Sequence, residues 1–140
     1  PTGARVEFSY TANQERLSGI TDSAGRVTSF TYDAAGNLTK ITYPDGSFST
    51  YAYQGHSLTE AKSFDGYTVC YECANDFQVP RVSKVYEKYG SETGQSLKIS
   101  YHNGSTTVFE DCGLDGDLNT TADNRITTYN FDNMGRVTDV

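Results

Sequence analysis

The chain has 140 residues, of which 36% are hydrophobic, and carries 11 Tyr and 7 Phe with a formal net charge of −7. This length suits one domain with a modest core. The acidic balance argues against nucleic acid as a partner, because phosphate binding needs a basic surface. No apolar run reaches the roughly 20 residues that a membrane-spanning helix requires.

β-Strands are predicted along the whole chain, because β-branched and aromatic residues dominate between the turn signals and no stretch has a convincing helical period. Residues 82–89 could be taken for a helix from their Lys and Glu content, but they fit a twisted strand as well. A turn is expected at 90–94, and longer connections at 74–80 and 111–124. The predicted strands are 5–10, 16–21, 26–32, 37–43, 48–53, 58–64, 68–73, 82–89, 97–102, 106–110, 125–131 and 136–140.

The clearest turn signal lies between Tyr32 and Asn37. Asp33, at the first turn position, can accept hydrogen bonds from the turn's own N–H groups, and Gly36, at the fourth, can take a positive φ. A type I turn followed by a left-handed Gly is a common hairpin closure. The same offset recurs in Asp22 with Gly25 and in Asp132 with Gly135, which follow the same turn rule.

Other dipeptides close further turns in the sequence. Asp45-Gly46 follows Pro44, and Asp65-Gly66 and Asn103-Gly104 have the composition of type I′ turns. Repetition at so short a period predicts hairpins stacked into one continuing sheet.

Two segments carry a family resemblance. Tyr32-Asp33-x-x-Gly36-Asn37-Leu38-Thr39 and Phe131-Asp132-x-x-Gly135-Arg136-Val137-Thr138 resemble the tyrosine–aspartate (YD) repeats of RHS proteins. These repeats occur in bacterial RHS and wall-associated proteins, insecticidal toxin complexes and animal teneurins. In this chain Phe30 replaces the first Tyr of the pattern and Asn37 replaces its Arg. The clearest repeats are 17–53 and 125–140, whereas 54–124 retain few signature residues.

The resemblance implies an all-β fold, an antiparallel meander of hairpins in an open, strongly twisted sheet. Residues 1–140 are then a single repeat domain and a fragment of a longer RHS β-shell, secreted or cell-wall associated. The implied partners are the rest of that chain and an enclosed or displayed C-terminal toxin or effector. Edge strands near Val6 and Val137 could also pair with another copy, since they expose unpaired backbone groups.

A glycan- or cell-surface-binding module is the alternative function. Tyr offers a flat apolar face and a hydroxyl, which suit sugars as well as a sheet. The candidate contacts are Tyr43, Tyr51 and Tyr53. A row of solvent-facing Tyr would favour binding, and buried Tyr would favour an architectural role.

The chain is not expected to be an enzyme. It has no Gly-x-Ser-x-Gly, phosphate-loop or His-Glu-x-x-His motif, and His56 and His102 are interpreted as hairpin-tip residues. The self-cleavage signature of the larger family proteins, Asp-Pro-x-Gly-Leu, is also missing from this sequence.

Cys70 and Cys73 have the spacing of a redox or zinc pair but lie in a predicted strand, where residues three apart point to opposite faces. With Cys112 the count is three, so at most one disulfide can form. The resemblance to surface proteins would permit a disulfide that involves Cys112.

The acidic loop places possible calcium ligands at suitable spacings. An EF-hand starting at Asp115 would need Gly at 120 and Glu at 126, where the chain has Thr120 and Ile126. Asp and Asn also cap turns in long loops, so the calcium hypothesis competes with a structural role. No other cofactor is expected. The candidate ligands are Asp111, Asp115, Asp117, Asn119 and Asp123.

Overall fold

A computed structural model describes residues 5–74, 79–113, 118 and 123–140. Within these ranges the chain forms twelve β-strands and no helix, so it has no helix that could cross a membrane. The strands are β1 (Glu7–Tyr10), β2 (Leu17–Thr21), β3 (Val27–Tyr32), β4 (Leu38–Thr42), β5 (Phe48–Gln54), β6 (Ser57–Lys62), β7 (Tyr67–Ala74), β8 (Arg81–Tyr89), β9 (Glu92–His102), β10 (Ser105–Asp111), β11 (Asn124–Phe131) and β12 (Val137–Asp139).

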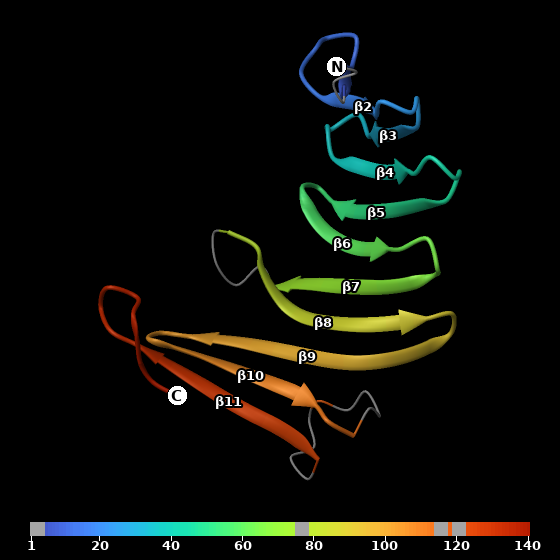
Figure 1. The fold of residues 1–140 in the computed structure, drawn as a ribbon. Helices are drawn as coiled ribbons and strands as arrows, with labels where there is room; N and C mark the ends of the chain where they lie inside the picture. Colours follow the sequence, from blue (N-terminus) through green and yellow to red (C-terminus); the bar gives the residue numbers. More distant parts are fainter. Residues whose placement is uncertain (1–4, 75–78, 114–117, 119–122) are drawn as a thin grey trace. The chain divides into compact units, whose positions relative to one another are not determined.

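The chain divides into two compact units, Pro1–Gly66 with β1 to β6 and Tyr67–Val140 with β7 to β12 (Figure 1). Within each unit every strand pairs antiparallel with the next strand in sequence. Each unit is an open meander, because its first and last strands are not neighbours in the strand order. The predicted all-β antiparallel meander is confirmed. The single domain over 1–140 stays a prediction.

The first unit has two chemically different faces. Successive strand residues point to opposite sides of a sheet, so the register decides which residues share a face. On the polar face Lys40 lies opposite Thr31 and Thr50, and Thr50 lies opposite Lys62. The apolar face of the first unit carries the pairs Phe8 with Ile20, Phe30 with Ile41, Tyr32 with Leu38, Tyr51 with Ala61 and Tyr53 with Leu58.

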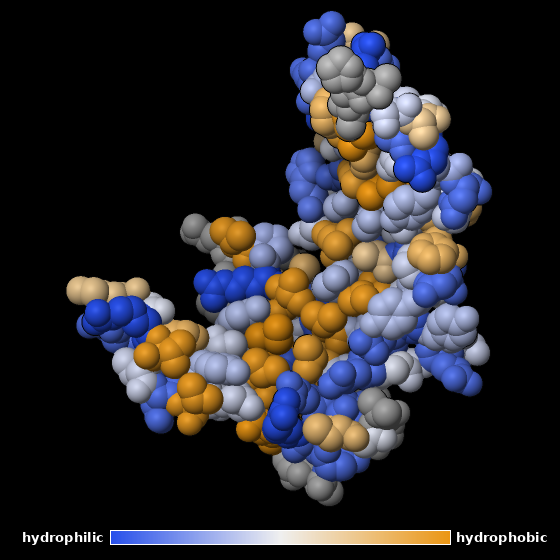
Figure 2. Space-filling model, in the orientation of Figure 1, coloured by the Kyte–Doolittle hydropathy of each residue, from blue (hydrophilic) through white to orange (hydrophobic). Residues whose placement is uncertain are grey.

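The second unit shows the same division. Figure 2 shows hydrophobic side chains gathered over β7, β8 and β9. Val85 lies opposite both Tyr71 and Leu97, and Ile99 lies opposite Val108, so these residues share one face. The residues that alternate with these, among them Lys84, Lys98 and Phe109, lie on the opposite face.

Most side chains on these sheets are only half-buried. The buried hydrophobic residues among the described ones are Cys70 and Leu118, which are 5% and 7% exposed. A sheet covered so lightly depends on its backbone ladder and on contacts between side chains opposite each other on neighbouring strands.

The type I′ turns predicted at Asp65-Gly66 and Asn103-Gly104 are wrong. A type I′ turn needs positive φ at both central residues, but Gln14 is the one non-glycine described with positive φ. The Gly66 N–H instead donates to the Ser63 carbonyl (3.1 Å), which makes Gly66 the fourth residue of a four-residue turn. In Asn103-Gly104, only Gly104 has positive φ.

The turn predicted at 90–94 is shorter in the structure. Tyr89 pairs with Glu92, so Gly90 and Ser91 alone form the loop and β9 begins at Glu92 instead of Leu97. The extra length is taken up by a register shift between β8 and β9. Residues 82–89, for which a helix was the alternative, lie in strand β8.

The two faces of the first unit predict unequal effects of a charge placed on each. Ile41→Asp should lower the free energy of unfolding by about 1–2 kcal/mol more than Thr42→Asp, because Ile41 packs on the apolar face. Both positions lie in β4, so the low β-propensity of Asp is common to both. Urea unfolding of the two variants measures the difference. Equal losses would contradict the assignment of faces.

Candidate functional site: the repeated hairpin turn

Three turns share one backbone geometry. Gly25, Gly36 and Gly135, for which positive φ is predicted, have φ of 77°, 87° and 75°. The N–H of each donates to the carbonyl of the Asp three residues earlier, at 3.0, 3.0 and 2.9 Å. The N–H of that Asp donates to the carbonyl of the residue after the Gly, which closes the hairpin. This is a type I turn followed by a left-handed Gly.

The Asp side chain binds the inside of the turn. Asp22 Oδ1 accepts from the N–H groups of Ala24 and Arg26, both at 2.9 Å. Asp132 Oδ1 accepts in the same way from the residues two and four positions later, at 2.8 and 3.0 Å. These hydrogen bonds favour the ionised carboxylate. The bond from the Arg26 N–H is the main cause that lowers the pKa of Asp22, and the Arg136 N–H does the same for Asp132.

The residue after the Gly holds the second carboxylate oxygen. Arg26 Nε donates to Asp22 Oδ2 and Arg136 Nε donates to Asp132 Oδ2, both at 2.7 Å. These two ion pairs are largely exposed, so their own contribution to stability is small. Their main effect is to orient the carboxylate toward the turn.

Asn37 replaces the arginine in the central turn and adds a link to the next hairpin. Its Nδ2 donates to Asp33 Oδ2 (2.9 Å) and to the Gly55 carbonyl (2.8 Å), and its Oδ1 lies 2.7 Å from His56 Nδ1. The Asn37 hydrogen bonds also lower the pKa of Asp33. Asn37, which stands where the resembled pattern has Arg, therefore links its own turn to the turn at Gly55 and His56 in the first unit. It also gives the hairpin-tip His56 a structural contact.

Two further side chains of the YD signature bind the backbone. Thr39 Oγ1 donates to the Thr31 carbonyl and Thr138 Oγ1 donates to the Asn130 carbonyl, both at 3.2 Å. Each bond crosses from the return strand to the strand that enters the turn. The threonine that follows the Gly by three residues therefore fastens the base of the hairpin.

A tyrosine latch joins neighbouring strands and was not predicted from the sequence. The Tyr32 hydroxyl donates to the Leu17 carbonyl (2.8 Å), and the guanidinium carbon of Arg16 lies 5.9 Å from its ring centre. In the second unit the Tyr101 hydroxyl donates to Val82 (2.8 Å), with the guanidinium carbon of Arg81 5.2 Å from the ring centre. An Arg followed by an apolar residue one strand before a Tyr is the signal that could have indicated it.

Asp45 occupies the third position of its turn and acts differently. The Gly46 N–H donates to the Tyr43 carbonyl, and Gly46 has φ of 85°. Asp45 Oδ1 accepts from the backbone N–H and the hydroxyl of Ser47, at 2.9 and 2.6 Å. Asp65 lies at the same position of the Ser63–Gly66 turn, and its Oδ1 accepts from the Ser63 hydroxyl.

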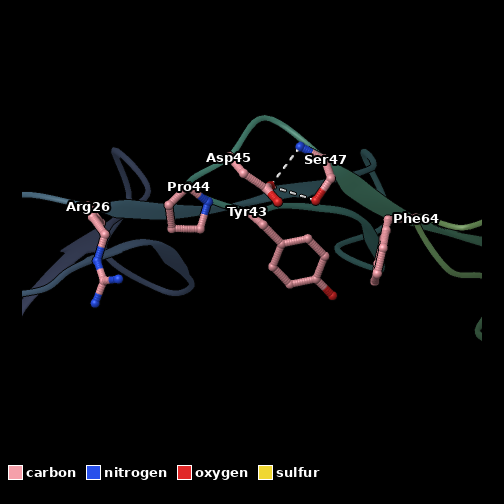
Figure 3. A pocket seen from close by; sticks show the side chains of 6 residues that line it. All are labelled: Arg26, Tyr43, Pro44, Asp45, Ser47 and Phe64. Carbon is pink, nitrogen blue, oxygen red and sulfur yellow. Dashed lines mark hydrogen bonds between the residues drawn. The ribbon is translucent and has the colours of Figure 1, made fainter.

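A pocket of about 570 Å³ opens beside the 43–46 turn (Figure 3). The rings of Tyr43 and Phe64 meet edge to face in it, with centres 6.4 Å apart. Figure 3 shows the Tyr43 ring between Arg26 and Phe64, with the Asp45–Ser47 hydrogen bonds above it. The lining residues are Arg26, Tyr43, Pro44, Asp45, Ser47 and Phe64.

The three tyrosines predicted as glycan contacts are only partly brought together by this pocket. Tyr43, Tyr51 and Tyr53 are all half-buried on the first unit, but only Tyr43 lines the pocket. Burial raises the pKa of Tyr51, and the neighbouring hydroxyls of Tyr43 and Tyr53 raise it further. Glycan contact by these residues stays a prediction.

The calcium hypothesis stays a prediction. Asp115, Asp117 and Asn119 lie outside the described residues, while Asp111 is buried at the end of β10 and Asp123 precedes β11. Across the described ranges, no three His, Cys, Asp or Glu side chains come together as a metal site would require.

The three cysteines are free thiols in the structure. Cys70 is buried, Cys73 is half-buried and Cys112 is exposed. Cys70 pairs with Tyr86 and Cys73 with Val82, with a register shift between them. The second predicted hairpin-tip histidine, His102, is the last residue of β9, next to the Asn103-Gly104 turn.

The fold and its repeated turns define a β-hairpin repeat protein. The family model RHS Repeat matches residues 10–47, from the end of β1 to the turn after β4. The match covers this part of the chain and supports the predicted resemblance to RHS/YD-repeat proteins, whose repeats are structural. A search of curated proteins finds no match to the chain.

Replacing a turn glycine should destabilise the chain, because a side chain is strained at positive φ. Gly25→Ala should cost about 1 kcal/mol, and the space around it is open. Gly36→Ala should cost at least as much, because its new Cβ would also push the flexible Arg16 guanidinium away from the Tyr32 ring. Urea unfolding measures both losses, with Ala24→Gly as the control. If Gly25→Ala left stability unchanged, the turn geometry would be wrong.

The turn carboxylates predict a loss of stability in acid. Asp22, Asp33 and Asp132 have pKa values lowered from the ordinary 3.8. Their stabilisation is therefore complete above that value and is lost as the pH falls through the lower pKa of the folded state. The urea concentration at the midpoint of unfolding should decrease when the pH is lowered below about 4. In the variant Asp132→Asn this decrease should be smaller. Asp139→Asn, outside the turns, is the control; an equal effect of both variants would contradict the prediction.

Proposed function

We propose that this chain is a wall segment of the β-shell of a secreted or cell-surface RHS protein, in which it helps to enclose or display a C-terminal toxin or effector region. The RHS repeat at residues 10–47 supports a structural repeat role. RHS repeat proteins are generally secreted or found at the cell surface, which supports the proposed location.

The proposal rests on one observation: the same Asp-x-x-Gly hairpin turn occurs three times in the chain. In the turns begun by Asp22, Asp33 and Asp132, the carboxylate and the left-handed Gly satisfy the turn from within. A hairpin closed in this way needs no partner at its tip, so hairpins can be added one after another. This is the property that a long wall of repeats requires.

The two faces of the sheet support the same role. In the first unit an apolar face rich in aromatic residues lies opposite a face of Thr, Ser and Lys residues that also carries Phe48. A wall that separates an interior from solvent needs two different surfaces. A catalytic site would instead need a convergent set of titratable groups.

The proposal is tested on the full-length protein by protection of its C-terminal region from protease. In the native protein that region should survive while exposed linkers are cut, and Gly36→Ala combined with Ile41→Asp should make it at least partly cleavable because the wall is weakened. Thr42→Asp is the matched control on the polar face. A C-terminal region that is cut at the same rate in all three proteins would contradict enclosure.

The pocket beside Tyr43 favours a second candidate function, the binding of a neutral glycan. An aromatic ring with a nearby carboxylate and guanidinium matches the mixture of stacking and hydrogen bonding that a sugar ring uses. A glycan array probed with this chain should show a ligand whose binding is lost in Tyr43→Ala and kept in Tyr53→Phe, since Tyr53 does not line the pocket. No bound glycan, or equal loss in both variants, would remove this function.

A further inference from the structure

The turn between β9 and β10 leaves two groups that can react with each other without a hydrogen bond. His102 pairs with Ser105, so Asn103 and Gly104 alone form the loop, and both are exposed. Among the residues that the structure describes, none accepts a hydrogen bond from the Gly104 N–H, and none bonds the Asn103 side chain. The Gly104 carbonyl, by contrast, accepts from the Phe131 N–H (2.8 Å), which links this loop to the end of β11.

The turn at Asp45 has a similar local sequence but is held by hydrogen bonds. Asp45 and Asn103 are both followed by Gly and then Ser. The Gly46 N–H donates to the Tyr43 carbonyl (3.0 Å), which fixes the backbone nitrogen. Asp45 Oδ1 accepts from the N–H and the hydroxyl of Ser47, at 2.9 and 2.6 Å. The two residues that follow are therefore the same in both turns, and the turns differ in their hydrogen bonding.

An Asn that is followed by Gly can react with its own backbone. The backbone nitrogen of the Gly attacks the side-chain carbonyl carbon of the Asn and forms a C–N bond, which closes an imide ring. The side-chain nitrogen leaves as ammonia and takes the Gly N–H proton with it. Water then opens the imide at either carbonyl and gives Asp or isoaspartate, in which the main chain runs through the side chain. The reaction is fastest before Gly, because a β-carbon on the attacking residue would crowd the approach.

We propose that Asn103 is a site of spontaneous deamidation, at which the Gly104 nitrogen forms the imide and water gives Asp or isoaspartate. The Gly104 N–H is exposed and makes no hydrogen bond, so base can remove its proton. The Asn103 side chain is free to rotate toward this nitrogen, because no hydrogen bond holds its amide elsewhere. Every other Asn in the sequence is followed by a residue with a side chain, so Asn103 should react first.

The reaction would change a junction between two hairpins of the second unit. Deamidation adds one negative charge to a chain whose net charge is −7. Isoaspartate also adds one carbon to the backbone of the loop, which would displace the Gly104 carbonyl from the Phe131 N–H. Phe131 directly precedes the Asp132 turn, so the modification would loosen the connection of this turn to the neighbouring hairpin.

The test is peptide mapping by mass spectrometry of the 140-residue chain after incubation at mildly alkaline pH. Deamidation should be at least about tenfold faster at Asn103 than at Asn130 or Asn133, which precede residues with side chains. An isoaspartate-specific methyltransferase with a labelled methyl donor should mark the peptide that contains position 103. Asn103→Gln, which would need a larger ring, should lose the label. Equal rates at the three asparagines, or a label kept in Asn103→Gln, would overturn the proposal.

The variant Asp45→Asn tests whether the open turn is the cause. It places a second Asn-Gly-Ser sequence in a turn whose Gly46 N–H is bound to the Tyr43 carbonyl, and its side-chain oxygen can still accept from Ser47. In the native chain, position 45 should deamidate at least about tenfold more slowly than Asn103, whereas in urea the two should react at similar rates. Thermal unfolding checks that the variant folds. Equal rates in the native chain, or a difference that persists undiminished in urea, would overturn the proposal.

Discussion

The structure depends on one local constraint, the left-handed backbone that ends each Asp-x-x-Gly turn. At Gly36 this conformation lets the N–H donate back to the Asp33 carbonyl while the chain enters the return strand with the right twist. The Asp33 carboxylate then binds the N–H of Asn37, which fixes the first residue after the glycine. Because a turn fixes which residues of its two strands face each other, it also decides which side chains reach each face.

The consequences extend from the turns to the faces of the sheet. A slip of one residue at the 33–36 turn would move Phe30 and Ile41 to opposite faces and break up the apolar face of the first unit. Few of the side chains that the structure describes are fully buried, so they form no deep core that could correct such a slip. Further bonds at the base of the hairpins, from Thr39 and from Tyr32, act against the same error. The hydrogen bonds of the turns thus fix the strand register, which in a thicker domain is also fixed by packing in the core.

Much of this could be predicted from local sequence. Asp33 and Gly36 indicate their turn because each acts within four residues of chain, and the β-branched and aromatic residues of 26–32 indicate a strand for the same reason. The type I′ prediction for Asp65-Gly66 is wrong because a dipeptide does not show at which residue the turn begins. In the structure the turn begins at Ser63, whose carbonyl accepts a hydrogen bond from the Gly66 N–H. The start of β9 was missed because a register shift opposite β8 absorbs the extra residues.

The contacts between strands could not be predicted in this way. The latch between Tyr32 and Leu17 joins residues fifteen positions apart, and the opposition of Lys84 to Lys98 depends on the exact register of two strands. A single residue of slip would place those lysines on different faces, so the sequence alone does not show that they face each other. Asn37 shows the same limit, since its bond to Gly55 depends on where the next hairpin lies.

Native-state amide hydrogen exchange tests the central claim most directly. The N–H groups of Gly25, Gly36 and Gly135 each donate to the carbonyl of their turn's Asp, so they should exchange as slowly as the neighbouring strand amides although they lie in hairpin turns, where Gly25 and Gly135 are exposed. The N–H of Ala34, for which the structure records no backbone hydrogen bond, should exchange fast and serves as the internal reference. If the three glycine amides exchanged as fast as Ala34, the turns would be open in solution and could not set the register of the sheet.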